Sequence, residues 1–303
     1  MIHKKMQTLN YRKEEKTEMK KSKKRSRFAE TWRRLRKNKV AMVSLFVLIA
    51  IILVSILAPV ISPYGYAETN KKNTLQGSSK EHLLGTDRLG RDILSRLIWG
   101  GRQSLQMGII AVLIAAVAGI LIGSIAGYFG GWLDNLLMRL LDIYQSIPMM
   151  LLCITFAAIL GPSLRNAIIA IGISMVPGFA RMMRASILSV RESEYIEAAV
   201  CCNATNRMII LKSIIPNAIS PMIVNITMSI GGAVLSGAGL SFIGLGVEAP
   251  MAEWGAMISD ARNYMRKVPT LALYPGLCIM ITVLAFNLLG DGLRDALDPR
   301  LKN

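Results

Sequence analysis

Hydrophobic runs that carry almost no charge alternate with polar segments along most of the chain. Six runs are present, at residues 40–61, 104–128, 140–160, 167–180, 219–245 and 271–289. The first contains 22 residues. As an α-helix it would be about 33 Å long, enough to cross a hydrocarbon core about 30 Å thick. The pattern predicts an all-α, polytopic membrane protein with six transmembrane helices.

The composition agrees with this pattern. Of the 303 residues, 52% are hydrophobic and only 18% are charged, whereas a soluble domain carries about a quarter charged residues. So few charges cannot cover the surface of a soluble protein, and so many apolar residues exclude a disordered chain. The four cysteines show no C-x-x-C spacing, which predicts free thiols rather than a zinc or redox site.

Basic residues are concentrated before the first run. The net charge is +17, and residues 1–39 hold 16 of the 36 Lys and Arg but only four acidic residues. By the positive-inside rule this tail is cytoplasmic, and with six spans both termini are then cytoplasmic. Phe28, Trp32 and Leu35 have helical spacing in the tail and predict a short interfacial helix. The tail has no recognisable nucleic-acid-binding fold, so we expect lipid, and no nucleic acid, as its partner.

Residues that usually carry enzymatic chemistry are scarce. The two histidines, His3 and His82, are isolated and are expected at the surface, and no Gly-Lys dipeptide is present for a phosphate loop. We therefore expect no enzyme activity, metal site or cofactor in this chain itself. The runs also lack charged residues at membrane depth, which disfavours an ion-coupled secondary carrier. Energy for any transport should come from another chain.

The longest internal segment on the expected cytoplasmic side, residues 191–221, predicts two short helices joined by a turn. Glu197 lies in the first turn of the first helix, where the helix dipole favours acids. Asn203 tolerates a left-handed backbone and marks the turn. The second helix is expected over 205–215, with Pro216 ending it. Physics alone leaves two interpretations, an amphipathic connector packed under its own bundle or a surface for a partner.

The same segment resembles the EAA loop of ABC importer permeases. The resemblance is carried by Glu197-Ala198-Ala199, by Asn203 four positions later, and by Ile214-Ile215-Pro216. It implies that the loop docks on an ATP-hydrolysing subunit, with coupling residues Glu197, Ala198, Ala199, Asn203, Ile214 and Pro216. The family usually has Gly at the turn and Leu before the Pro, where this chain has Asn203 and Ile215.

Three further blocks narrow the resemblance. Trp32-Arg33-Arg34-Leu35 with the first run, Leu84-Gly85-Thr86-Asp87-Arg88, and Asn287-Leu288-Leu289-Gly290-Asp291 are similar to the C-type permease subunit of dipeptide, oligopeptide and nickel importers. The resemblance runs from Trp32 to Leu301. It implies the type I ABC importer transmembrane fold in the cell membrane. The chain would form half of a pathway for di- or oligopeptides.

The implied partners are a homologous permease in a heterodimer, two ATP-binding subunits and an extracytoplasmic solute-binding protein. Within the same branch, a permease for nickel or a metal chelate is the alternative. Outside it, the alternatives are an ion-coupled secondary carrier and a membrane scaffold without transport.

A charged block precedes the second run. Asp87 with Arg91, and Asp92 with Arg96, are opposite charges spaced i, i+4, worth only about 0.2–0.5 kcal/mol each on an exposed helix. They are interpreted either as a solvated juxtamembrane helix or as a contact for the solute-binding protein or the pathway entrance.

These features divide the chain into consecutive parts. The expected parts are a basic cytoplasmic tail with an interfacial helix (1–39), a first transmembrane helix (40–61), an extracytoplasmic loop (62–101), a permease core of five transmembrane helices (102–291) with its coupling loop (191–217), and a cytoplasmic C-terminus (292–303).

Overall fold

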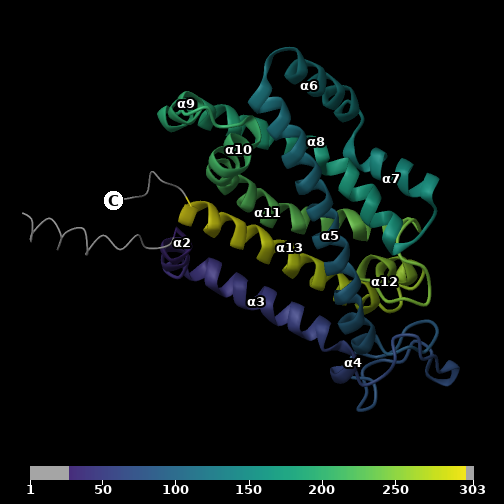
Figure 1. Ribbon diagram of the computed structural model, residues 1–303. Helices are drawn as coiled ribbons and strands as arrows, with labels where there is room; N and C mark the ends of the chain where they lie inside the picture. The colour runs from purple at the N-terminus through teal and green to yellow at the C-terminus, as the bar shows by residue number, and fades with distance from the viewer. Residues whose placement is uncertain (1–26, 298–303) are drawn as a thin grey trace, which may run out of the picture.

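The computed structural model describes residues 27–297, and within that range it contains helices and loops but no strand (Figure 1). Most of the predicted basic tail and the last six residues lie outside the described residues. The helices are α2 (Arg27–Leu35), α3 (Lys39–Ile56), α4 (Ala58–Ile61), η1 (Lys71–Asn73), α5 (Ile93–Phe129), α6 (Gly131–Gln145), α7 (Met149–Leu160), α8 (Leu164–Arg191), α9 (Glu194–Cys201), α10 (Asn206–Met208), η2 (Ile209–Ile214), α11 (Ile215–Phe242), α12 (Trp254–Ala261) and α13 (Thr270–Leu297).

Five of these helical stretches are long and apolar enough to cross a membrane, namely α3, α5, α8, α11 with the residues before it, and α13. A sixth span is present if α6 and α7, which are bent by 82° at a short break, are counted together as one. The six predicted spans are therefore confirmed, provided that the bent pair counts as one span.

The third predicted span, residues 140–160, is wrong as a single straight helix. Helix α6 ends at Gln145 and α7 begins at Met149. Pro148 has φ −53° and ψ 133° and is therefore not helical, and its ring disfavours a helical conformation at Ile147 before it. Its carbonyl then accepts the N–H groups of Leu151 and Leu152, which starts α7.

Helices α5 and α8 extend beyond the limits predicted for their spans. Helix α5 begins at Ile93 rather than at 104, because the carboxylate of Asp92 accepts the Ser95 N–H at 2.7 Å and caps the helix. The predicted extracytoplasmic loop is correspondingly shorter. Helix α8 has 28 residues, and Pro177 lies inside it without ending it.

The centre of the bundle is the contact between α5 and α8. Gly119, Gly123 and Gly127 lie on the face of α5 that meets α8, and a Cβ atom on Gly123 would collide with the Ala180 carbonyl. Absent side chains let the two backbones approach closely, as small residues do in membrane helix pairs. The G-x-x-x-G repeat therefore serves packing within this chain.

The two ends of the bundle are distinct (Figure 1). Helices α2, α9 and α10 lie at one end with the C-terminal part of α13, and α4 and α12 lie at the other. We call these the inner and outer ends. Helix α2 lies where a short interfacial helix is predicted, and its Leu35 is buried in one cluster with Leu289 and Ala296 of α13. Its contact with a membrane surface stays a prediction.

Substitution Gly123→Ala tests the close approach of α5 and α8. An added methyl group would force the backbones apart, and overpacking of this kind costs about 1–3 kcal/mol. We expect a lower thermal midpoint for the purified chain in detergent, measured by loss of the monodisperse size-exclusion peak. The control is Gly276→Ala in α13, where a Cβ meets no atom within 4 Å. Equal midpoints for the two variants would contradict the packing described.

Candidate functional site

Helix α9 and its turn form the first part of the site. Glu194 and Glu197 lie in the first turn of α9, as predicted. The chain reverses at Asn203, whose φ of +57° is in the left-handed region, and the Ala204 N–H donates to the Ala199 carbonyl at 3.1 Å. The predicted helix–turn is confirmed, including the conformation of Asn203.

The second predicted helix is wrong at its end. Thr205 caps α10, but the helix then continues through the π-helical η2 into α11, so that residues 206–242 form one stretch of 37 residues. Pro216 lies in the first turn of α11, where a missing N–H costs least. The wider π turn directly before it is closed by the Ile215 N–H, which donates to the Ile210 carbonyl.

The six predicted coupling residues differ in exposure. Glu197, Ala198, Asn203 and Pro216 are exposed, Ala199 is half-buried against the core, and Ile214 is fully buried. Ile196 and Ile209 are buried with Ile214 and anchor the segment to the bundle. One surface of α9 therefore remains open while its other side is fixed.

Polar contacts tie this segment and its neighbours to the inner end of the bundle. The Tyr128 hydroxyl of α5 donates to Asn206 Oδ1 of α10 at 2.8 Å. Arg184 of α8 binds Asp134 of α6 with two hydrogen bonds, of 2.5 and 2.6 Å. A bidentate pair fixes direction as well as distance, so α6 and α8 are held in register where the chain leaves the bundle.

A cavity of about 440 Å³ lies at the break between α6 and α7. Its walls come from the α6–α7 junction, the middle of α8 and one face of α11. Its polar lining residues are Tyr144, Gln145, Ser174, Asn225 and Ser229, and none of its lining residues is charged.

Sequence reasoning missed this cavity, although signals for it were present. Pro148 interrupts a hydrophobic run, and irregular backbone at membrane depth is tolerated only where it is covered by protein or lines a cavity. Asn225 and Ser229 are spaced i, i+4 and so share one face of α11. Which helices meet that face depends on contacts distant in sequence.

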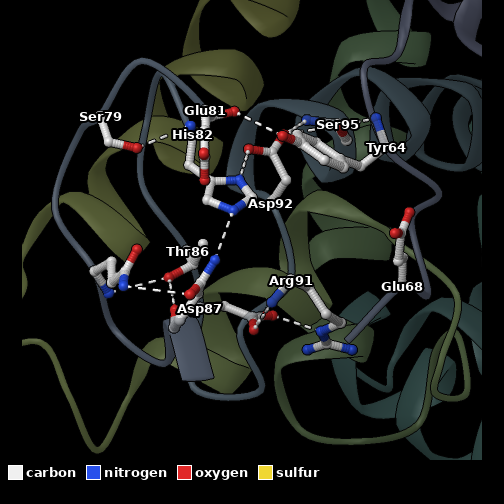
Figure 2. Close-up of polar contacts among 12 residues, drawn as sticks. Tyr64, Glu68, Ser79, Glu81, His82, Thr86, Asp87, Arg91, Asp92 and Ser95 are labelled. Atoms are coloured by element: carbon white, nitrogen blue, oxygen red, sulfur yellow. Dashed lines mark hydrogen bonds and ion pairs between the residues drawn. The ribbon is translucent and has the colours of Figure 1, made fainter. Parts of the chain in front are cut away.

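The outer end carries a network of buried polar side chains (Figure 2). His82 Nδ1 lies 3.0 Å from Asp92 Oδ1, and the other carboxylate oxygen of Asp92 accepts the Ser95 N–H and hydroxyl. The Arg91 guanidinium donates to Asp87 at 2.6 Å and to Asp260 at 2.9 Å. The network joins the loop before α5 to α12.

Two predictions about this region are corrected. His82 is buried rather than at the surface, because its ring lies between Asn73, Asp92 and Tyr64. Asp92 does not pair with Arg96. Arg96 instead donates to the carbonyls of Tyr66 and Pro250.

The four predicted entrance residues thus belong to this internal network. Arg91, Asp92 and Arg96 are each about 3% exposed, and Asp87 is mostly covered. Their hydrogen bonds and ion pairs all go to other groups of this chain, and these contacts hold the outer loop against α5 and α12. A direct contact of this block with another protein stays a prediction.

Comparison with known proteins identifies related chains. Residues 119–303 match the family model of the binding-protein-dependent transport system inner membrane component. Residues 26–77 match the N-terminal TM domain of oligopeptide transport permease C. The dipeptide transport system permease protein DppC of Alkalihalophilus pseudofirmus is 49% identical over 92% of this chain and 91% of its own length. The glutathione transport system permease protein GsiD of Pectobacterium atrosepticum is 41% identical over 92% of this chain and 93% of its own.

A solved structure supports the fold. The inward-facing MetNI methionine ABC transporter contains a chain that matches 68% of this chain and 98% of its own length. The TM-score is 0.57 and the sequence identity 22%.

Substitutions at Asn203 test the left-handed turn. A left-handed backbone costs an ordinary residue about 1–2 kcal/mol, and a β-branched side chain is poorly suited to it. We expect Asn203→Val to loosen α9, with faster amide hydrogen exchange over residues 194–201. Asn203→Gly should leave exchange unchanged or slower. Equal exchange in the two variants would show that the turn does not hold α9.

Proposed function

Because the chain belongs to the family of binding-protein-dependent transport system inner membrane components, we propose that it is a permease subunit of an ATP-driven peptide importer. In this role it forms half of a transmembrane pathway and receives energy from a separate ATPase subunit. Membership of this family argues against the two alternative functions, an ion-coupled secondary carrier and a membrane scaffold without transport.

Continuity between the α9–α10 segment and the cavity carries this proposal. The open surface of α9 is fixed by the Asn203 turn to α10, and α10 continues into α11 without a break. Helix α11 supplies Asn225 and Ser229 to the cavity wall. A partner that pushes on α9 therefore displaces α10, and through α10 it displaces α11, the helix that lines the cavity.

Peptides are the substrate class that the relatives favour. The related permeases are described as transporting dipeptides or glutathione, which is itself a peptide. The cavity is uncharged and of a size typical for small-molecule sites, about 300–1,000 Å³. A short peptide fits this class of site better than a bare metal ion, which requires charged or imidazole ligands.

A chain that forms only half of a transport pathway needs other subunits to complete it. A second, homologous permease would close the open side of the cavity, two ATP-binding subunits would dock at the inner end, and a solute-binding protein would deliver substrate at the outer end. Coupling residues are expected among Glu197, Ala198, Ala199 and Asn203. We also propose that both termini lie in the cytoplasm.

Substitution Ala198→Trp tests the docking surface. Ala198 is exposed, so the larger side chain does not disturb this chain's own packing. In a fitted contact, overpacking of about 1–3 kcal/mol lowers affinity about 5- to 150-fold. We expect weaker pull-down of the ATPase and loss of substrate-stimulated ATP hydrolysis.

A matched control is Ala29→Trp on α2, which is also exposed at the inner end. It should bind the ATPase as the parent does. If Ala198→Trp binds and couples like this control, α9 is only a connector.

The native cysteines test the orientation. Cys201 and Cys202 are exposed at the inner end, Cys153 is buried and Cys278 is half-buried in α13. A membrane-impermeant maleimide should therefore label the parent chain only after the cells are permeabilised. A Ser78→Cys variant in the outer loop should be labelled in intact cells. Labelling of the parent in intact cells would reverse the proposed topology.

A further inference from the structure

The cavity at the α6–α7 break contains several polar groups without partners. Among the described residues, the side chains of Gln145, Asn225 and Ser229 make no hydrogen bond. The Tyr144 hydroxyl is buried near Ser174 but makes no hydrogen bond of normal geometry. Gln145 is exposed and Asn225 and Ser229 are half-buried, so a polar ligand in the cavity can reach donors and acceptors that the chain itself does not use.

Other polar groups in the spans behave differently. The hydroxyls of Ser174, Thr227 and Ser236 each donate to the carbonyl four residues earlier, at 2.8 to 3.0 Å. Such bonds satisfy a hydroxyl inside its own helix. A primary amide has two donors and an acceptor, so a single bond of this kind, such as the one from Asn217 Nδ2 to the Ser213 carbonyl, cannot satisfy all of its groups. Gln145 and Asn225 are therefore the lining side chains that offer a ligand the most donors and acceptors.

A peptide group is a matching partner for these amides. It presents one N–H donor and one C=O acceptor, and a side-chain amide offers an acceptor and donors in a similar plane. The cavity has no charged lining residue that would select an acidic or basic side chain. We propose that it is a subsite for the peptide main chain, in which Gln145 and Asn225 bind a peptide group of the substrate. This inference rests on the proposed peptide importer.

The remaining wall suits variable side chains. Met149, Met175 and Met182 line the cavity together with Phe179. Methionine is unbranched and polarizable, and it adapts its shape to different apolar neighbours. Main-chain recognition by amides combined with an adaptable methionine wall would accept many sequences. Selection between peptides would then depend little on this chain.

An ester substrate separates main-chain recognition from other effects. In alanyl-lactate an ester oxygen replaces the peptide N–H of alanyl-alanine, so one donor is lost while the shape is kept. Uptake of both compounds is measured in the full reconstituted importer, for the parent and for the variant Gln145→Leu/Asn225→Leu. The same binding protein serves both assemblies, so its own preference cancels in the comparison.

We expect the parent to favour the peptide over the ester more than the variant does, by about three- to tenfold, the range of one net hydrogen bond. The uptake ratio of alanyl-alanine to alanyl-leucine should not change, because the amides do not contact side chains. The single variant Asn225→Gln, which keeps an amide, should retain the preference. The control Asn287→Leu lies in α13, outside the cavity lining, and should also retain it.

Two results would overturn the proposal. One is an unchanged peptide-to-ester ratio in the double variant. The other is an equal loss of both substrates in an assembly that still binds its ATPase. If the parent assembly takes up neither compound, the proposed function itself fails, which is a different result.

Discussion

No water is available in the hydrocarbon core to satisfy a peptide group, and this constraint organises the whole chain. Where the backbone stays helical, each N–H and C=O is satisfied within its own segment. The glycines on α5 carry no side chain, so the backbone of α8 can pack directly against the backbone of α5. Where the helix is interrupted, other groups must compensate. The break at residues 146–148 is therefore confined to the wall of a cavity.

The same constraint explains how the inner end is connected to the cavity. Pro216 would be expected to interrupt the ladder of hydrogen bonds, but it lies just after a π turn that already rearranges that ladder. The helix therefore continues from Asn206 to Phe242. Ile196, Ile209 and Ile214 hold the α9–α10 segment to the core beside it. A push at α9 has a direct structural route to Asn225.

Patterns local in sequence predicted much of this arrangement. Hydrophobic run lengths gave the spans, and Asn203 gave the turn because its left-handed backbone is a property of a single residue. The three prolines show where local reasoning stops. Pro148 lies in a break between two helices, whereas Pro177 and Pro216 lie within continuous helical stretches. The outcomes differ although each residue is a proline in an apolar context, so no local pattern distinguishes them.

The contacts of the buried polar residues at the outer end also differ from those predicted, because their partners lie far away in the sequence. The charges of Asp92 and Arg96 have helical spacing, but Asp92 caps α5 and Arg96 reaches carbonyls more than 25 residues away in either direction. Candidate coupling residues could be named from sequence because they lie in one short segment. The cavity could not, because its walls come from four helices.

On the proposed coupling route, α10, η2 and α11 move as one body when the ATPase acts. A distance measurement between spin labels at Arg207→Cys and Leu235→Cys tests this motion, in a chain whose Cys201 and Cys202 are replaced by Ser. We expect the same distance distribution in the nucleotide-free and ATP-bound complexes, while the distance from position 207 to the partner permease changes. If the distance between positions 207 and 235 changes as much, the π-helical segment is a hinge and the proposed coupling route is contradicted.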